Sequence, residues 1–99
     1  MNEEKLRGLM GLCTRARQAV FGEEGCLKEI RGGKCGVLLL DGEISPAAER
    51  KYRGACAEAE VTVGKLPPGL LERATGRPGM AMAVRKGSFA EQMEKMLQS

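Results

Sequence analysis

Cysteines and paired glutamates are the side chains of this 99-residue chain that could carry chemistry. A nucleophilic cysteine normally works with a histidine that removes its proton, and the sequence contains no histidine. No two cysteines have the CxxC spacing that favours a zinc site or a redox pair. We therefore expect reduced, mostly buried thiols at all four positions, Cys13, Cys26, Cys35 and Cys56.

The glutamate pairs are Glu3–Glu4 and Glu23–Glu24. Each pair falls in the first turn of an expected helix, where the helix dipole favours carboxylates, so no acid–base catalysis is needed to explain them. The GxGxxG and GxxxxGK[ST] motifs are absent, so no nucleotide cofactor is indicated. We expect a non-catalytic protein without a cofactor. For the alternative, an enzyme that uses Cys26 or Glu24, the sequence names no base and no second partner.

The composition is that of a single globular domain, residues 1–99, with 42% apolar and 29% charged residues. Sixteen Lys and Arg against thirteen Asp and Glu leave a net charge of +3, which suits a polyanionic partner without requiring one. The first residues are acidic and resemble no signal or transit peptide, and the longest apolar runs, 37–40 and 80–84, are too short for a bilayer. We expect a soluble, cytoplasmic protein with no membrane partner.

The apolar spacing of Leu6, Leu9, Met10 and Cys13 predicts a helix over residues 3–18. A short strand is expected at 19–21. Gly22 then opens a second helix, which ends at Gly32–Gly33. Residues 35–40 read as a buried central strand because they are apolar and bounded by glycine.

Ser45 and Pro46 predict the start of a third helix, since serine caps a helix and proline suits its first turn. The remaining chain predicts a strand at 61–63, a loop at 66–69, a helix at 70–75, a strand at 80–84 and a last helix after Gly87–Ser88. This alternation favours a three-layer α/β/α sandwich with a mainly parallel or mixed sheet.

Aromatic residues are scarce, with only Phe21, Tyr52 and Phe89 in the sequence. Proteins that read single-stranded RNA usually stack bases on several aromatic side chains, so such a platform is not expected. An RNA partner would instead be a folded shape, contacted through backbone amides, helix N-termini and basic side chains.

Several strings of residues together resemble the ribosomal L-seven-Ae family, and more narrowly its bacterial YlxQ-like branch. They are GLCTRAR at 11–17, FGEEGCLKEIRGGK at 21–34, the strand at 37–40, ATGR at 74–77 and the segment from Met82 to Ala90. The resemblance covers nearly the whole chain. It implies an α/β/α sandwich with a small mixed sheet, and RNA bound at one edge.

The resemblance also implies particular site residues. In this family the first turn of the second helix enters a kink-turn through a GxNExxK motif. By position, Gly22 would allow close backbone approach, Glu23, Glu24 and Gly25 would expose amides, and Lys28 would meet phosphate or guanine. A second loop, in which an apolar residue packs on an extruded nucleotide, maps to Lys65, Leu66, Pro67, Pro68 and Gly69. Arg15, Arg17 and Lys34 are expected to flank this edge and Arg77 to approach it, and Arg31 is a further candidate RNA contact on the second helix.

Glu24 and Gly25 stand where kink-turn binders usually have asparagine and glutamate. The first hypothesis is therefore a ribosome-associated protein that binds a kink-turn, ribosomal RNA or another structured RNA, with ribosomal or RNA-processing proteins as further partners. The alternative is a protein–protein interaction module that keeps this fold and has lost RNA binding.

Overall fold

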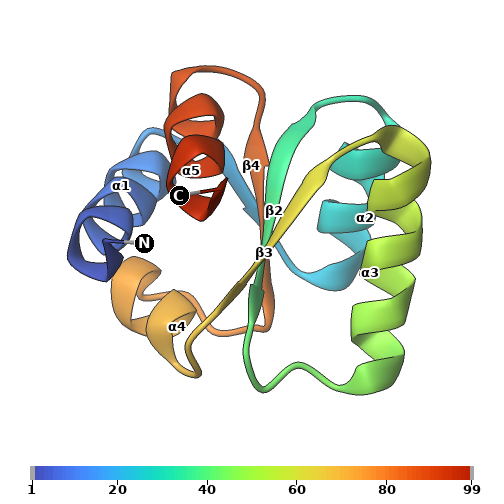
Figure 1. The fold of residues 1–99 in the computed structure, drawn as a ribbon, viewed down its shortest axis with the longest axis horizontal. Helices are drawn as coiled ribbons and strands as arrows, with labels where there is room; N and C mark the ends of the chain where they lie inside the picture. Colours follow the sequence, from blue (N-terminus) through green and yellow to red (C-terminus); the bar gives the residue numbers. More distant parts are fainter. Residues whose placement is uncertain (1, 99) are drawn as a thin grey trace.

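Helices and strands alternate throughout the computed structural model, which describes residues 2–98 (Figure 1). Within this range the chain forms five helices and four strands. In chain order they are α1 (Glu3–Arg15), β1 (Ala19–Phe21), α2 (Glu23–Arg31), β2 (Cys35–Asp41), α3 (Pro46–Ala59), β3 (Thr62–Leu66), α4 (Leu70–Thr75), β4 (Ala81–Arg85) and α5 (Ser88–Gln98).

The strands form one mixed sheet in the order β1-β4-β2-β3. β2 and β3 are parallel, whereas β4 is antiparallel to both β1 and β2. β1 and β3 are therefore the two edge strands, and β2 is central as the sequence predicts.

Figure 1 shows the sheet edge-on between two layers of helices, with α1, α4 and α5 on one face and α2 and α3 on the other. The side chains of β2 alternate between these layers, because successive residues of a strand point to opposite faces. Val37 and Leu39 belong to the core on the α1 side. Leu38 and Leu40 belong to the core on the α2 side. The predicted α/β/α sandwich is confirmed.

Two predicted boundaries are wrong. Helix α1 ends at Arg15 and not at residue 18, because Arg17 adopts a left-handed backbone (φ 59°) that turns the chain into β1. Strand β3 continues to Leu66, where the expected strand stops at 63. Leu66 pairs with Asp41 of β2 and is only 2% exposed, so it is part of the core and not of a loop.

All four cysteines are buried, as expected, and their thiols are free. Across residues 2–98, none of the helices has both the length and the apolar character that crossing a membrane requires.

Candidate functional site

The N-terminal turn of α2 is open to solvent and has no capping side chain. Its first intrahelical hydrogen bond runs from the Cys26 amide to the Gly22 carbonyl at 2.9 Å. The three amides before it, those of Glu23, Glu24 and Gly25, therefore have no acceptor within the helix. Such a turn presents N–H donors and the positive end of the helix dipole to an anion.

The structure favours glycine at both Gly22 and Gly25 of this turn. Gly22 has φ 86° and ψ 150°, a backbone conformation almost restricted to glycine. A Cβ atom at Gly25 would lie 2.8 Å from Cγ1 of Val20 on β1. Glycine at position 25 thus lets α2 pack closely on β1, which accounts for its presence where the resembled motif has glutamate.

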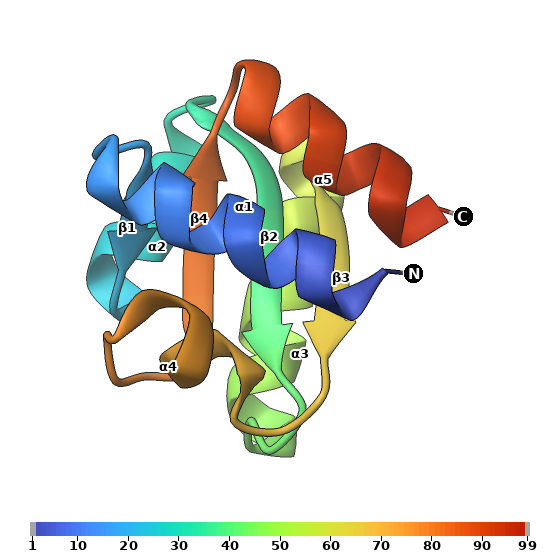
Figure 2. The same ribbon diagram turned by 90° about the vertical axis from the view of Figure 1, so that its left-hand side faces the viewer.

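The loop of residues 76–80, between α4 and β4, lies beside this turn (Figure 2). The antiparallel pairing of Phe21 with Met82 brings the residues before β4 next to the residues that follow β1. A groove of about 340 Å³ separates the α2 turn from the start of α3, with Gly22, Glu23 and Met80 among its lining residues. Met80 is 44% exposed, so this groove offers an accessible apolar side chain.

Arg77, in the 76–80 loop, contacts residues next to the α2 turn. Its guanidinium carbon lies 4.7 Å from the centre of the Phe21 ring, within range of a cation–π interaction. Its amide also donates to the Thr75 hydroxyl at 3.1 Å. Because Phe21 directly precedes Gly22, the structure places Arg77 next to the α2 turn.

The charges around the turn are unevenly paired. Glu23 is bound by Lys51 of α3, with 2.7 Å between Nζ and Oε1. Glu24 and Lys28 are exposed and form no ion pair with another described residue. Lys28 and Arg31 both lie in the last turn of α2 and face solvent. The exposed side of α2 therefore carries two free cations and one free carboxylate.

Three of the predicted basic residues do not flank the α2 turn. Arg17 and Lys34 lie at the opposite end of the sheet, where the Arg85 amide donates to the Gln18 carbonyl at 2.9 Å and the Lys86 amide to the Lys34 carbonyl at 3.0 Å. β1 runs from that end to the end where Gly22 lies. Arg15 lies in a groove between α1 and α4, across the sheet from α2.

The expected second loop is also elsewhere. Lys65 and Leu66 end β3, the edge strand farthest from β1, and residues 67–69 follow it. Three strand intervals of about 5 Å each therefore separate this segment from β1, which leads into the α2 turn. Leu66 is buried, and Lys65 is paired with Glu49 of α3 at 2.9 Å. Pro67 and Pro68 are exposed, and the Gly69 amide donates to Asp41 Oδ2 at 2.9 Å. Buried Leu66 cannot reach a nucleotide, and the loop that lies beside the turn is 76–80.

The Cys26 thiol near this turn is not poised for chemistry. It donates to the Val20 carbonyl at 3.3 Å. Burial raises the pKa of Cys26 to about 11, and the nearby Glu29 carboxylate adds to this effect. Because a thiolate is the reactive form, a thiol with this pKa is a weak nucleophile at neutral pH.

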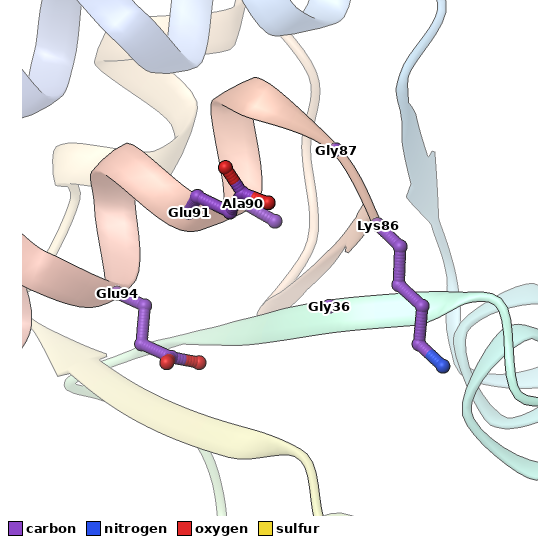
Figure 3. Close-up of a pocket in the computed structure, with 6 residues that line it drawn as sticks. All are labelled: Gly36, Lys86, Gly87, Ala90, Glu91 and Glu94. Carbon is purple, nitrogen blue, oxygen red and sulfur yellow. The ribbon is translucent and has the colours of Figure 1, made fainter.

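A second pocket, of about 220 Å³, lies between α5 and β2 (Figure 3). Lys86 lines one side, and Glu91 and Glu94 line the other. Glu94 also accepts a hydrogen bond from the Thr62 hydroxyl at 3.0 Å. Two carboxylates facing one lysine do not favour a phosphate group, so this pocket is a poorer candidate for a polyanion than the α2 turn.

Solved structures of other proteins share this fold. A protein of unknown function from Bacillus halodurans superposes with a TM-score of 0.90 at 24% identity, covering 96% of this chain and 98% of the other. The Giardia lamblia 15.5kD RNA binding protein superposes with a TM-score of 0.80 at 15% identity, covering 96% and 86%. The fold is thus the α/β/α sandwich of the ribosomal L-seven-Ae type.

Sequence relatives identify the family of this chain, although no family model matches it. It is 31% identical to RNA-binding protein YlxQ of Bacillus subtilis (strain 168) over 91 residues, which is 90% of this chain and 91% of the relative. It is 22% identical to RNA-binding protein YlxQ of Enterococcus faecium, covering 98% and 95%. The chain belongs to the YlxQ family.

Proposed function

We propose that this protein binds structured RNA, without catalysing a reaction, at the edge formed by the first turn of α2 and the 76–80 loop. The observation that carries the proposal is the uncapped α2 turn beside Arg77, in a chain whose curated relatives are named RNA-binding proteins. Backbone amides at a helix start bind phosphate or base oxygens, and a guanidinium group binds phosphate.

In the proposed complex, Gly22 lets the RNA backbone come close, since no side chain projects from this position. The amides of Glu23, Glu24 and Gly25 donate to the RNA. Arg77, beside the first turn, and Lys28, in the last turn of α2, each contact a phosphate. Lys51 contributes indirectly, because its ion pair with Glu23 reduces the negative charge that an approaching phosphate meets.

Met80 takes the role that the resemblance implies for an apolar residue of the 65–69 loop. It is exposed at the groove beside the turn, whereas Leu66 is buried. An unstacked nucleotide entering this groove would bury the Met80 side chain and gain an apolar contact. The proposed RNA is therefore one that offers an extruded base, such as a kink-turn or a similar element of ribosomal RNA.

Aromatic stacking has little part in this mode of binding. Tyr52 is only 4% exposed, and the Phe21 ring is covered by Arg77. Recognition would rest on the shape and backbone of a folded RNA. We extend the proposal to a cytoplasmic role with ribosomal RNA, or with ribosomal or RNA-processing proteins, as partners.

The unpaired carboxylate of Glu24 favours a second candidate function. It is exposed in the turn that a phosphate would approach, and it would repel that phosphate. A protein–protein interaction module that uses the same edge for a cationic partner is consistent with this residue.

Binding of the purified protein to three RNAs across a salt series separates these functions. The RNAs are a kink-turn, an unkinked duplex of matched length and ribosomal RNA. We expect preference for the kink-turn, weakened by Lys28→Ala and unchanged by Lys95→Ala, which removes an exposed lysine from α5. Binding to ribosomal RNA alone would mean that the target is not a kink-turn, but would keep the proposed function of binding structured RNA. No salt-dependent binding to any of the three would contradict the proposal and favour the protein-interaction module.

A further inference from the structure

A groove of about 380 Å³ between α1 and α4 is lined by three arginines. Arg7 and Arg15 come from α1, where they are eight residues apart and so share one face, and Arg73 comes from α4. Glycine opens the α1 side of the groove at positions 8 and 11. A Cβ atom at Gly11 would lie 3.2 Å from the Ala74 carbonyl oxygen, so the two helices approach closely there.

The guanidinium groups in this groove are largely without protein partners. Neither Arg7 nor Arg15 forms an ion pair with another described residue. Arg73 makes one long hydrogen bond, from Nη1 to the Pro68 carbonyl at 3.4 Å. Among the described lining residues, Glu4 is the acidic one against these three cations. Most of the N–H donors in the groove are therefore free to bind an anion.

The α4 side of the groove leads along the chain to the edge assigned to RNA. Helix α4, which carries Arg73, leads directly into the 76–80 loop, which carries Arg77. Figure 2 shows α1 crossing the front of the sheet, with α4 and this loop below it and the start of α2 behind the loop. Arg73 and Arg77 thus connect the groove to the α2 turn around the β1 edge of the sheet.

We infer that this groove binds phosphate groups of the same RNA, on a stretch of backbone next to the segment held at the α2 turn. An arginine fork pairs with a phosphate through two parallel hydrogen bonds, so three arginines in one groove can bind neighbouring phosphates of a strand. The inference rests on the proposed function and deepens it. It assigns Arg7, Arg15 and Arg73 to a second contact surface, which sets how much flanking RNA the protein covers.

The test compares two kink-turn RNAs, one with minimal stems and one with stems lengthened by about one helical turn. The groove variant is Arg7→Gln with Arg15→Gln, both exposed residues whose loss leaves no buried group unpaired. The matched control is Arg50→Gln with Lys95→Gln, which removes the same charge from exposed positions on α3 and α5. The salt dependence of the affinity and the hydroxyl-radical footprint on the longer RNA are measured for each protein.

The wild-type protein should show a steeper salt dependence with the longer RNA. The groove variant should lower that slope by about 2, since each lost phosphate contact removes about 1, and should lose the footprint on the added stem. Its binding to the minimal RNA should match that of the control.

Equal slopes for the two RNAs with the wild-type protein would overturn the inference and leave the α2 site standing. A groove variant that behaves like the control would do the same. No binding of either RNA by the wild-type protein would overturn both the inference and the proposed function.

Discussion

Replacing Gly22 with alanine perturbs the backbone that holds the α2 turn open. Gly22 has φ 86° and ψ 150°, and a residue with a side chain costs about 1–3 kcal/mol in this conformation. A Cβ atom there would meet nothing within 4 Å, so the cost is backbone strain without a clash. For a domain of this size that cost corresponds to a fall in Tm of roughly 4–24 °C.

The same substitution should weaken RNA binding beyond its effect on folding. A backbone that relieves the strain by changing φ also redirects the amides of Glu23 to Gly25, and an alanine methyl group stands where RNA would approach. Gly33→Ala is the matched control, because Gly33 also has positive φ (75°) and open space around its Cβ position, but follows the other end of α2. It should cost about 1–2 kcal/mol and leave RNA affinity unchanged.

Urea unfolding gives the free energy of unfolding of each variant, and RNA affinity is measured at a temperature where all of them are folded. A Gly22→Ala protein as stable as the wild type would refute the strain argument. A destabilised Gly22→Ala protein with full RNA affinity would show that the backbone of this turn is not part of the binding site.

Three further predictions concern side chains that the structure places in contrasting surroundings. Met80→Gln should change the free energy of unfolding by less than about 0.5 kcal/mol, because Met80 is 44% exposed, and should weaken RNA binding in a fluorescence-anisotropy titration. The control is Leu12→Gln, at a residue that is 50% exposed on α1, which should change neither the free energy of unfolding nor the RNA affinity. Equal RNA affinity of the two variants would contradict RNA contact at the groove that Met80 lines. Leu66→Ala should cost about 2–5 kcal/mol in urea unfolding, since Leu66 is core, and a cost near zero would contradict that placement. Burial raises the pKa of Cys26 from 9.0 to about 11 and that of Cys35 to about 12, so both thiols keep their protons to higher pH in the folded state than in the unfolded state. The free energy of unfolding should therefore stay constant up to about pH 9 and fall above it. A free energy of unfolding that does not change between about pH 8 and 10.5 would contradict the burial of these thiols.

Local signals in the sequence were sufficient for most of the fold. The Ser45 hydroxyl accepts from the Ala48 amide at 3.2 Å, with proline in the first turn of α3, as the residue types predict. Gly32–Gly33 does end α2, and the apolar run at 35–40 is the central strand. These features depend on neighbours within one turn or one strand, so a single sequence reveals them.

The predicted loop position of Leu66 is wrong, although the sequence contains a local signal for its true position. The two prolines that follow Leu66 indicate a loop that begins at residue 66. The residue before a proline, however, favours extended backbone. Gly64 and Leu66 are buried on either side of exposed Lys65, which is the alternation of a strand. Two-residue periodicity would have extended β3 to Leu66.

The composition of the binding edge depends on long-range pairing that the sequence does not reveal. Arg17 and Gly22 are close in sequence, but β1 lies between them, and its three extended residues span about 10 Å. Conversely, the 76–80 loop reaches the α2 turn only because β4 pairs antiparallel with β1. Strand order and direction therefore decided which basic residues meet, and Arg77 was the predicted flanking residue that the pairing brought to the turn.

An NMR titration of the labelled protein with a kink-turn RNA locates the RNA-binding surface, because it reports on each amide separately. The largest amide shift changes should fall at residues 22–25 and 79–80, on the two sides of the proposed edge. Residues 33–36 and 86–87, at the opposite end of the sheet, should change little. Changes concentrated at that opposite end, or no changes at all with saturating RNA, would contradict RNA binding at the α2 turn.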